Sequence, residues 1–270
     1  MISLSMRKRQ QGIALAIVVW FIAGMSILVA GIVAQASVDI RMAQVHVARA
    51  KAAAAGDGAI MLMMADRQAA QSESPPENGW YSSVYRMGVL DVEVVLVPVT
   101  QLVNVNSADA QLLTLLFTEL AGVDAGEAQN LASSVVQWRQ QMKGQQRRME
   151  APEDLMAAGV SRTVLDAVRD YVVAGAIGSG GTQWGNMHPV LQSIARSYRP
   201  AQAGQPSGQT GGTSPGYRAD AIVKYGDSTW LRRRWISSAS SPYSDLPWRA
   251  LRTETPRVVT QPSTLVANSF

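Results

Sequence analysis

An uncharged segment near the N-terminus constrains this chain more than any other feature. It runs from Ile13 to Val38, 26 residues without a charged side chain. As an α-helix it would be about 39 Å long at about 1.5 Å per residue, enough to cross a bilayer core of about 30 Å. The run Arg7-Lys8-Arg9 precedes it, where the positive-inside rule places the cytoplasmic flank. The sequence therefore predicts a membrane helix, with the rest of the chain on the other side.

Charge and cysteine content narrow the function. The formal net charge is +4, and three of these charges come from the N-terminal run Arg7-Lys8-Arg9. The remainder is close to neutral, which gives no support to nucleic-acid binding. The chain has no cysteine, so it can form no disulfide, thiol nucleophile or cysteine metal site.

Three interpretations of the N-terminus are open: a plain membrane anchor, a secretory signal peptide and a prepilin-type signal. Ala34-Gln35-Ala36 fits the A-x-A cleavage pattern of a signal peptide, and an exported enzyme cut there would be one outcome. The apolar run ahead of that pattern is, however, about twice the usual 7–15 residues. In a prepilin the recognition glycine precedes the apolar run, so the helix survives processing.

The residues Arg9-Gln10-Gln11-Gly12-Ile13-Ala14-Leu15 resemble the cleavage region of type IV pilins and type II secretion pseudopilins. In that family prepilin peptidase cuts after the glycine and the new N-terminus is methylated. The resemblance implies that Gly12 and Ile13 flank the cut.

Most family members carry a glutamate at the fifth mature position, which here is Ile17. The K-type minor pseudopilins (the GspK family), which form the pilus tip, carry an apolar residue there. The family's glutamate is thought to pair with the amine of the subunit above it. A subunit that enters first has none above it, and an unpaired carboxylate in lipid costs several kcal/mol. Ile17 therefore favours the filament tip.

One long helix is predicted from the membrane segment to about Gln71, with a weak point at Gly56 and Gly58. The alternating residues 89–99 predict a strand, in which Asp91 and Glu93 share one face. A cation site there is the alternative to a solvated face, which is the simpler interpretation.

The segment Leu102-Val103-Asn104-Val105-Asn106-Ser107-Ala108 resembles the stretch that opens an all-helical domain inserted into the sheet of K-type pseudopilins. Ser107 is the predicted N-cap of an apolar helix over 108–120.

Two glycines, Gly122 and Gly159, each follow an apolar helix and are predicted to stop it in the left-handed conformation. Asp124 with Glu127, and Ser161, are the predicted caps of the helices that come next. Such units look like helix-hairpin-helix modules, which makes a membrane-anchored DNA-binding protein an alternative. The flanking acids favour packing instead.

The C-terminal third predicts a return to strands. Linkers are expected at 175–181 and 200–216, with a short helix at Val190–Ser197 between them. Strands are expected at 217–225 and 229–237 around a Gly226-Asp227 turn, and at 248–260. The sheet would draw on residues before and after the helical region, which indicates an insertion.

Arg232-Arg233-Arg234 is the sharpest basic patch, and nucleic acid, anionic lipid or a partner pseudopilin could meet it. The simplest interpretation is charge on an edge strand that discourages aggregation.

No catalytic constellation is found. The two histidines, His46 and His188, lie in no motif, and the acids Asp220, Asp227 and Asp245 are too loosely spaced for a metal site. K-type pseudopilins can bind calcium, but no ligand set can be matched here, so calcium stays open.

The sequence thus predicts an α+β fold: a long N-terminal membrane-spanning helix packed on an antiparallel pilin-like sheet, with an inserted all-helical domain. The expected segments are a leader 1–12, a transmembrane half 13–38, an amphipathic helix and first part of the pilin-like domain 39–103, a helical insertion 104–200, a linker 201–216 and completing strands 217–270.

The resemblance implies a non-enzymatic minor pseudopilin at the tip of the type II secretion pseudopilus, acting in protein export and pseudopilus initiation. It would sit in the bacterial inner membrane with a periplasmic C-terminal domain. Its implied partners are the I-type and J-type minor pseudopilins, the major pseudopilin, prepilin peptidase and the inner-membrane assembly platform. A minor pilin of a type IV pilus or competence system is the alternative.

Overall fold

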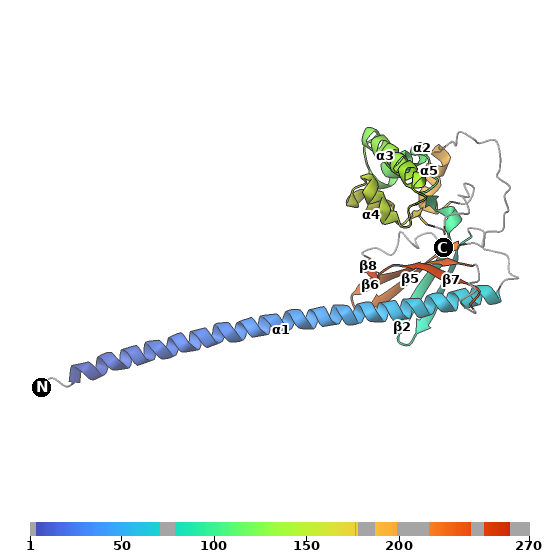
Figure 1. The fold of residues 1–270 in the computed structure, drawn as a ribbon. Coiled ribbons are helices and arrows are strands. Elements are labelled where there is room, and N and C mark those ends of the chain that lie inside the picture. The colour runs from blue at the N-terminus through green and yellow to red at the C-terminus, as the bar shows by residue number, and fades with distance from the viewer. Residues whose placement is uncertain are drawn as a thin grey trace, which may run out of the picture. The chain divides into compact units, whose positions relative to one another are not determined.

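The computed structural model describes residues 4–70, 79–175, 177, 187–198, 216–238 and 246–259, and for residues 4–14 it describes the backbone alone. The chain divides into two compact units, Met1–Lys51 and Ala52–Phe270. Figure 1 shows a long helix, an antiparallel sheet and a group of shorter helices. These elements confirm the predicted α+β class with a long N-terminal helix, a sheet and a helical region.

Helix α1 spans Leu4–Ala69, so it starts within the predicted leader and ends two residues before Gln71. No proline interrupts the chain from Ile13 to Ser74, and alanine and methionine favour a helix. In the first unit its described side chains, from Leu15 on, are almost all exposed.

The part of α1 that belongs to the second unit buries one face. Its buried residues recur at intervals of three or four positions, as expected for one stripe of a helix. They are Ala52, Ala55, Ala59, Ile60, Met63 and Met64. This stripe packs on the sheet, in agreement with the predicted amphipathic half.

Gly56 and Gly58 do not weaken α1, contrary to the prediction, since the helix continues through both. A Cβ on Gly56 would lie 2.8 Å from the Cβ of Arg232 and 3.3 Å from the Cβ of Ala221. A Cβ on Gly58 would lie 2.5 Å from the Cε of Met87. The two glycines let the helix approach the sheet closely.

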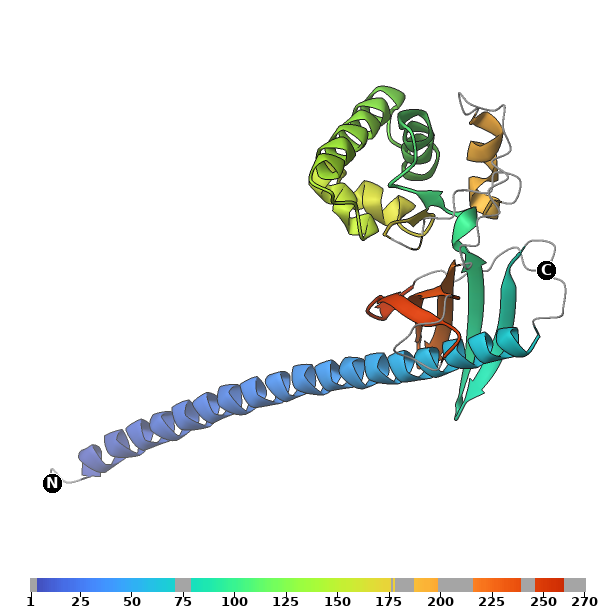
Figure 2. The same ribbon diagram turned by 45° about the vertical axis from the view of Figure 1, so that its right-hand side comes forward.

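The main sheet is antiparallel and has the order β1-β2-β5-β6-β7, with β8 also paired to β6. The part of helix α1 from residue 52 to 69 lies against one face of it (Figure 2). The strands are β1 (Tyr81–Met87), β2 (Leu90–Pro98), β5 (Gly216–Tyr225), β6 (Ser228–Ser237), β7 (Arg249–Thr253) and β8 (Arg257–Val258).

The predicted strands 89–99, 217–225 and 229–237 are confirmed as β2, β5 and β6, and 248–260 contains the two short strands β7 and β8. Strand β1 was not predicted. Asp91 and Glu93 do lie on the same face of β2, and they are exposed and partly exposed respectively.

A helical region enters the chain between the neighbouring strands β2 and β5. A short parallel pair, β3 with β4, stands on either side of the segment that holds α2, α3, η2 and α4, and the buried Trp80 donates a hydrogen bond to Gln101 just before β3. The elements are η1 (Val99–Gln101), β3 (Val103–Asn104), α2 (Ala110–Ala121), α3 (Ala125–Gly144), η2 (Pro152–Ala158), α4 (Arg162–Val168), β4 (Val172–Val173), η5 (Pro189–Leu191) and α5 (Gln192–Ser197).

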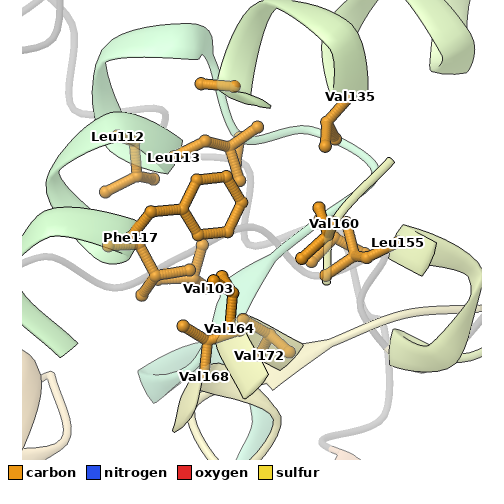
Figure 3. Packing of buried hydrophobic residues seen from close by; sticks show 14 of the residues in the cluster. Val103, Leu112, Leu113, Phe117, Val135, Leu155, Val160, Val164, Val168 and Val172 are labelled. Carbon is orange, nitrogen blue, oxygen red and sulfur yellow. The ribbon is translucent and has the colours of Figure 1, made fainter. Parts of the chain in front are cut away.

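The helical region has a core of its own (Figure 3). Leu112, Leu113 and Phe117 of α2 meet residues of α3, η2 and α4. Fully burying a side chain such as Leu or Phe contributes about 1.5–3 kcal/mol.

The asparagine pair in the segment that opens this region has a structural role. Asn106 exchanges two hydrogen bonds with the backbone of Met149: its Nδ2 donates at 2.9 Å and its Oδ1 accepts at 3.0 Å. The Oδ1 of Asn104 accepts from the Asn106 N–H at 2.9 Å. The two side chains hold the turn after β3 against the backbone at Met149.

Helix caps agree in part with the sequence. Gly122 and Gly159 have left-handed φ values of 64° and 95°, and Ser161 caps α4, as predicted. The cap of α2 is Asp109 rather than Ser107, because the Asp109 carboxylate reaches the Leu112 N–H at 2.8 Å.

Asp124 caps α3, as predicted, through the Gly126 N–H at 3.0 Å. The helix that Ser161 caps is α4, and it ends at Val168, because Val172 a few residues on pairs with Val103 in the strand pair β3–β4. The short helix near Val190–Ser197 is confirmed as η5 and α5, while the expected linkers fall almost wholly outside the described residues.

Candidate functional site

The N-terminal helix supplies the first candidate surface. Among the described residues, α1 is the one helix whose length and apolar composition would let it cross a membrane, and its most apolar window is entirely unburied. Trp20 is 84% exposed and Leu15 is 70% exposed. Apolar side chains at such exposure in water are costly, so this surface is suited to lipid or to other apolar helices.

Gly12, Ile13 and Ile17 lie within two turns of one another in α1. Ile17 is 64% exposed. The cut between Gly12 and Ile13 remains a prediction.

Asp57 joins the second half of α1 to the sheet. Its carboxylate accepts from Nε and Nη2 of Arg232, both at 2.8 Å, and lies 3.2 Å from Nε of Arg234. This two-pronged geometry is the strong form of an arginine–carboxylate pair. Beside it, the absent side chain of Gly56 lets Arg232 lie against the helix.

The edge-strand interpretation of Arg232-Arg233-Arg234 is therefore wrong. Strand β6 lies inside the sheet, between β5 and the strands β7 and β8. Its arginines alternate between the two faces, as side chains in any strand do. Arg232 and Arg234 meet α1, whereas Arg233 points to the face that carries the helical region.

Arg233, which is only 1% exposed, is at the centre of a buried ionic cluster. It donates to Asp220 of β5 from Nε at 2.6 Å and from Nη2 at 3.0 Å. The Nε of Arg218, also fully buried, lies 2.9 Å from the second oxygen of Asp220. Burial would lower the pKa of Arg233, but the charges of Asp220 and Asp170 outweigh it and raise that pKa.

Asp170, between α4 and β4, connects this cluster to the helical region. It accepts from Nη1 of Arg233 at 2.5 Å and from Nη2 of Arg257 at 2.8 Å, and its carbonyl accepts from Arg218. Burial would raise the pKa of the Asp170 carboxyl, but the guanidinium groups of Arg233, Arg257 and Arg218 hold it well below its ordinary value. Through its carboxylate and its backbone carbonyl, Asp170 thus ties the helical region to three strands, β5, β6 and β8.

A second group of ion pairs lies beside the first. Glu153 of η2 accepts from Arg169 at 3.1 Å and from Arg252 of β7 at 2.7 Å. Glu254 lies 3.4 Å from Arg169 and accepts from the indole of Trp235 at 3.1 Å. We call the two groups together the ionic junction: Glu153, Arg169, Asp170, Arg218, Asp220, Arg233, Arg252, Glu254 and Arg257.

His188 is buried beside the ionic junction. Its ring lies 4.7 Å from that of Trp80 and 5.1 Å from that of Tyr171, and its Nδ1 accepts from the Val190 N–H at 3.3 Å. Burial lowers the pKa of His188 to about 3, and the positive charge of Arg218 acts in the same direction. It is a neutral packing residue.

Three further acids receive no support as a metal site. Asp220 belongs to the junction, Asp227 lies in the β5–β6 turn, and Asp245 lies outside the described residues. Within the described part of the chain no group of three or more His, Cys, Asp and Glu side chains could hold a metal ion. Calcium remains open.

The sequence carried one signal for the junction. Arg218 and Asp220, two positions apart in an alternating strand, must share a face. The identity of their partners could not be read from the sequence, because Asp170 lies in a different element.

Comparisons with known proteins add little to this geometry. No protein-family model matches the chain, and no curated protein matches it. A solved structure, that of the GspK-GspI-GspJ complex from the enterotoxigenic Escherichia coli type 2 secretion system, contains a chain that aligns with 80% of this one and 98% of its own length. The two are 11% identical, with a TM-score of 0.47. At those values the likeness carries no argument, and the fold class stands on the elements described above.

Proposed function

We propose that this chain is a K-type minor pseudopilin of a type II secretion system, placed at the tip of the pseudopilus. One observation carries the proposal. The chain's apolar N-terminal helix continues into a half that packs on an antiparallel sheet, and a helical region is inserted between two neighbouring strands of that sheet. This architecture agrees with what the residues around Gly12 and Asn104 imply by resemblance.

In this proposal Gly12 and Ile13 flank the prepilin peptidase cut, and Ile13 becomes the methylated N-terminus. The segment 1–12 is then a leader, and the helix from Ile13 to Val38 is the membrane anchor and an assembly element. Ile17 supports the tip position, because a first subunit has no neighbour above it to pair with a glutamate.

The remaining proposals follow from that role. The protein is a non-enzymatic structural subunit in the inner membrane, with the residues after Val38 in the periplasm. It assembles with the I-type and J-type minor pseudopilins, and with the major pseudopilin and the assembly platform. It acts in pseudopilus initiation and in export across the outer membrane.

The test is the N-terminal residue of the mature protein, measured by mass spectrometry after expression with prepilin peptidase. We expect N-methylated Ile13, and we expect the Gly12→Ala variant to keep its leader. A start at Ser37 would point to signal peptidase, and an intact Met1 would point to a plain anchor. Either result overturns the proposal.

A minor pilin of a type IV pilus or competence system would pass the same test. Co-purification distinguishes the two, because a K-type pseudopilin should be recovered with I-type and J-type pseudopilins expressed beside it. Recovery with neither would contradict the assignment to type II secretion.

A further inference from the structure

The helical region carries a surface groove that the proposed pseudopilin role does not use. It has a volume of about 850 Å³ and lies where the end of α3 meets the loop that follows and η2. That volume falls within the range of about 300–1,000 Å³ common among ligand sites in proteins.

The floor of the groove is apolar. Trp138 is partly buried and packs against the core of the helical region, and Met142 is 7% exposed. Tryptophan is among the residues that contribute most to binding at protein interfaces, because a large rigid ring loses little conformational entropy.

The rim of the groove is charged, and its acids are already engaged. Glu150 lies 3.0 Å from Nε of Arg148. The Oδ2 of Asp154 accepts from the N–H groups of Glu150 and Ala151, at 2.8 and 3.1 Å. Among the described residues, neither Lys143 nor Arg147 takes part in an ion pair, so the groove offers two free cations above an apolar floor.

The backbone holds these cations in a tight turn. Gln146 has φ 57°, and it is the one non-glycine residue with positive φ in the described part of the chain. Its N–H donates to the Lys143 carbonyl at 3.0 Å, and the Arg147 N–H donates to the Met142 carbonyl at 2.8 Å. Helices commonly end on a left-handed residue in this position, and here it fixes the backbone between Lys143 and Arg147.

We propose that this groove binds an acidic segment of a partner protein. An apolar side chain of the segment would lie on Trp138 and Met142, and flanking carboxylates would pair with Lys143 and Arg147. The two cations favour a partner segment with negative charge. The apolar floor favours a peptide, which can supply an apolar side chain, over a polyanion that has no apolar groups. The inference rests on the groove alone and does not depend on the assignment as a pseudopilin.

The test uses the full chain in a non-ionic detergent and a fluorescein-labelled peptide of glutamates with leucine at every third position. Binding is followed by fluorescence anisotropy. The double variant Lys143→Glu with Arg147→Glu should bind about tenfold more weakly, because two exposed ion pairs are replaced by repulsion. Trp138→Leu should also weaken binding.

The matched control is the double variant Lys224→Glu with Arg249→Glu. Both residues are exposed cations outside the groove, neither lies in an ion pair among the described residues, and the change in net charge is the same. It should bind as the parent does. Circular dichroism checks that each variant is folded.

Four results would overturn the proposal. The groove variant could bind as tightly as the parent, both double variants could weaken equally, or a lysine–leucine peptide could bind as well. Displacement of the peptide by oligothymidylate at lower concentration than by unlabelled peptide would also reject it, in favour of nucleic acid.

Discussion

Asp170 and Arg233 lie 2.5 Å apart, oxygen to nitrogen, where the helical region meets the centre of the sheet. Arg233 is almost fully buried, and two other arginines bind the same aspartate residue. An ionic contact of this kind adds little net stability compared with an apolar one, but it is costly to break because the remaining charges stay buried.

Asp170→Asn should therefore lower the free energy of unfolding by about 3–5 kcal/mol. The amide keeps the shape of the carboxylate but leaves three arginines without their shared charge. Urea denaturation of the full chain in detergent measures the loss.

The control for this prediction is Arg162→Gln. That arginine pairs with Asp166 at 2.9 Å, but its side chain is 63% exposed, so its loss should cost no more than about 0.5 kcal/mol. Equal losses in the free energy of unfolding would show that the ion pairs of the junction contribute no more than an exposed surface ion pair.

Gly56→Ala should destabilise the protein by about 1–3 kcal/mol, although alanine is the better helix former by about 1 kcal/mol. The new methyl group would lie 2.8 Å from Arg232 Cβ, so helix and sheet would have to separate. Thermal unfolding by circular dichroism measures the change.

Gly144→Ala is the matched control, since nothing lies within 4 Å of its added Cβ. It should leave stability unchanged or raise it by about 0.5–1 kcal/mol. Gly58→Ala should cost less than Gly56→Ala, because the atom it meets is the mobile end of Met87. A stabilising Gly56→Ala would contradict the close approach of α1 and the sheet.

His188 should make stability fall on acidification. Its pKa is about 3 in the folded chain and about 6.5 when unfolded, so between these values the unfolded state binds a proton that the folded state does not. This contribution is present in full above about pH 6.5 and is lost as the pH falls toward 3, at up to about 1.4 kcal/mol per pH unit.

Urea denaturation at pH 7.5, 6 and about 5 isolates this effect, because the low pKa of Asp170 adds its own loss only below the ordinary aspartate range. His188→Gln should flatten the profile over that interval, whatever its effect on stability at pH 7.5. An unchanged slope would mean that His188 is not buried as a neutral group.

Ile17→Glu should impair assembly if the chain forms the tip. A carboxylate on this exposed face of the apolar helix would have no amine above it to pair with, and a charge in lipid costs several kcal/mol. Secretion of a type II substrate in a strain carrying only the variant measures the effect. Ile17→Leu keeps the surface apolar and should leave secretion unchanged. Full secretion by the Ile17→Glu strain would remove the argument for the tip position.

The sequence was sufficient for the elements whose pattern is local. The absence of proline and charge predicted α1, and the β5–β6 hairpin was predicted to within one residue because Gly226 and Asp227 form its turn. The glycines that end α2 and η2 were also identified, because a left-handed residue after an apolar helix favours glycine.

Elements that depend on distant partners were missed. Strand β1 carries exposed serines and no clear alternation, since it pairs on one side only. Arg233 looked like a solvated charge because Asp170 and Asp220, which neutralise it, lie in other parts of the chain. Gly56 looked like a weak point of the helix because Arg232, which packs where its side chain would be, is equally remote in the sequence.

The pairing of Pro98 with Tyr217 has a consequence for the order of folding. These residues stand on either side of the whole helical insertion, yet they are neighbours in the sheet. The segment from β3 to β4 contacts itself over shorter sequence separations than those that join β2 to β5, and contacts between residues close in sequence form faster. During synthesis, which starts at the N-terminus, the helical region can therefore fold before β5 has been made. Until then the edge of β2 that later pairs with β5 is uncovered, so the β1–β2 hairpin is open to pairing with another polypeptide.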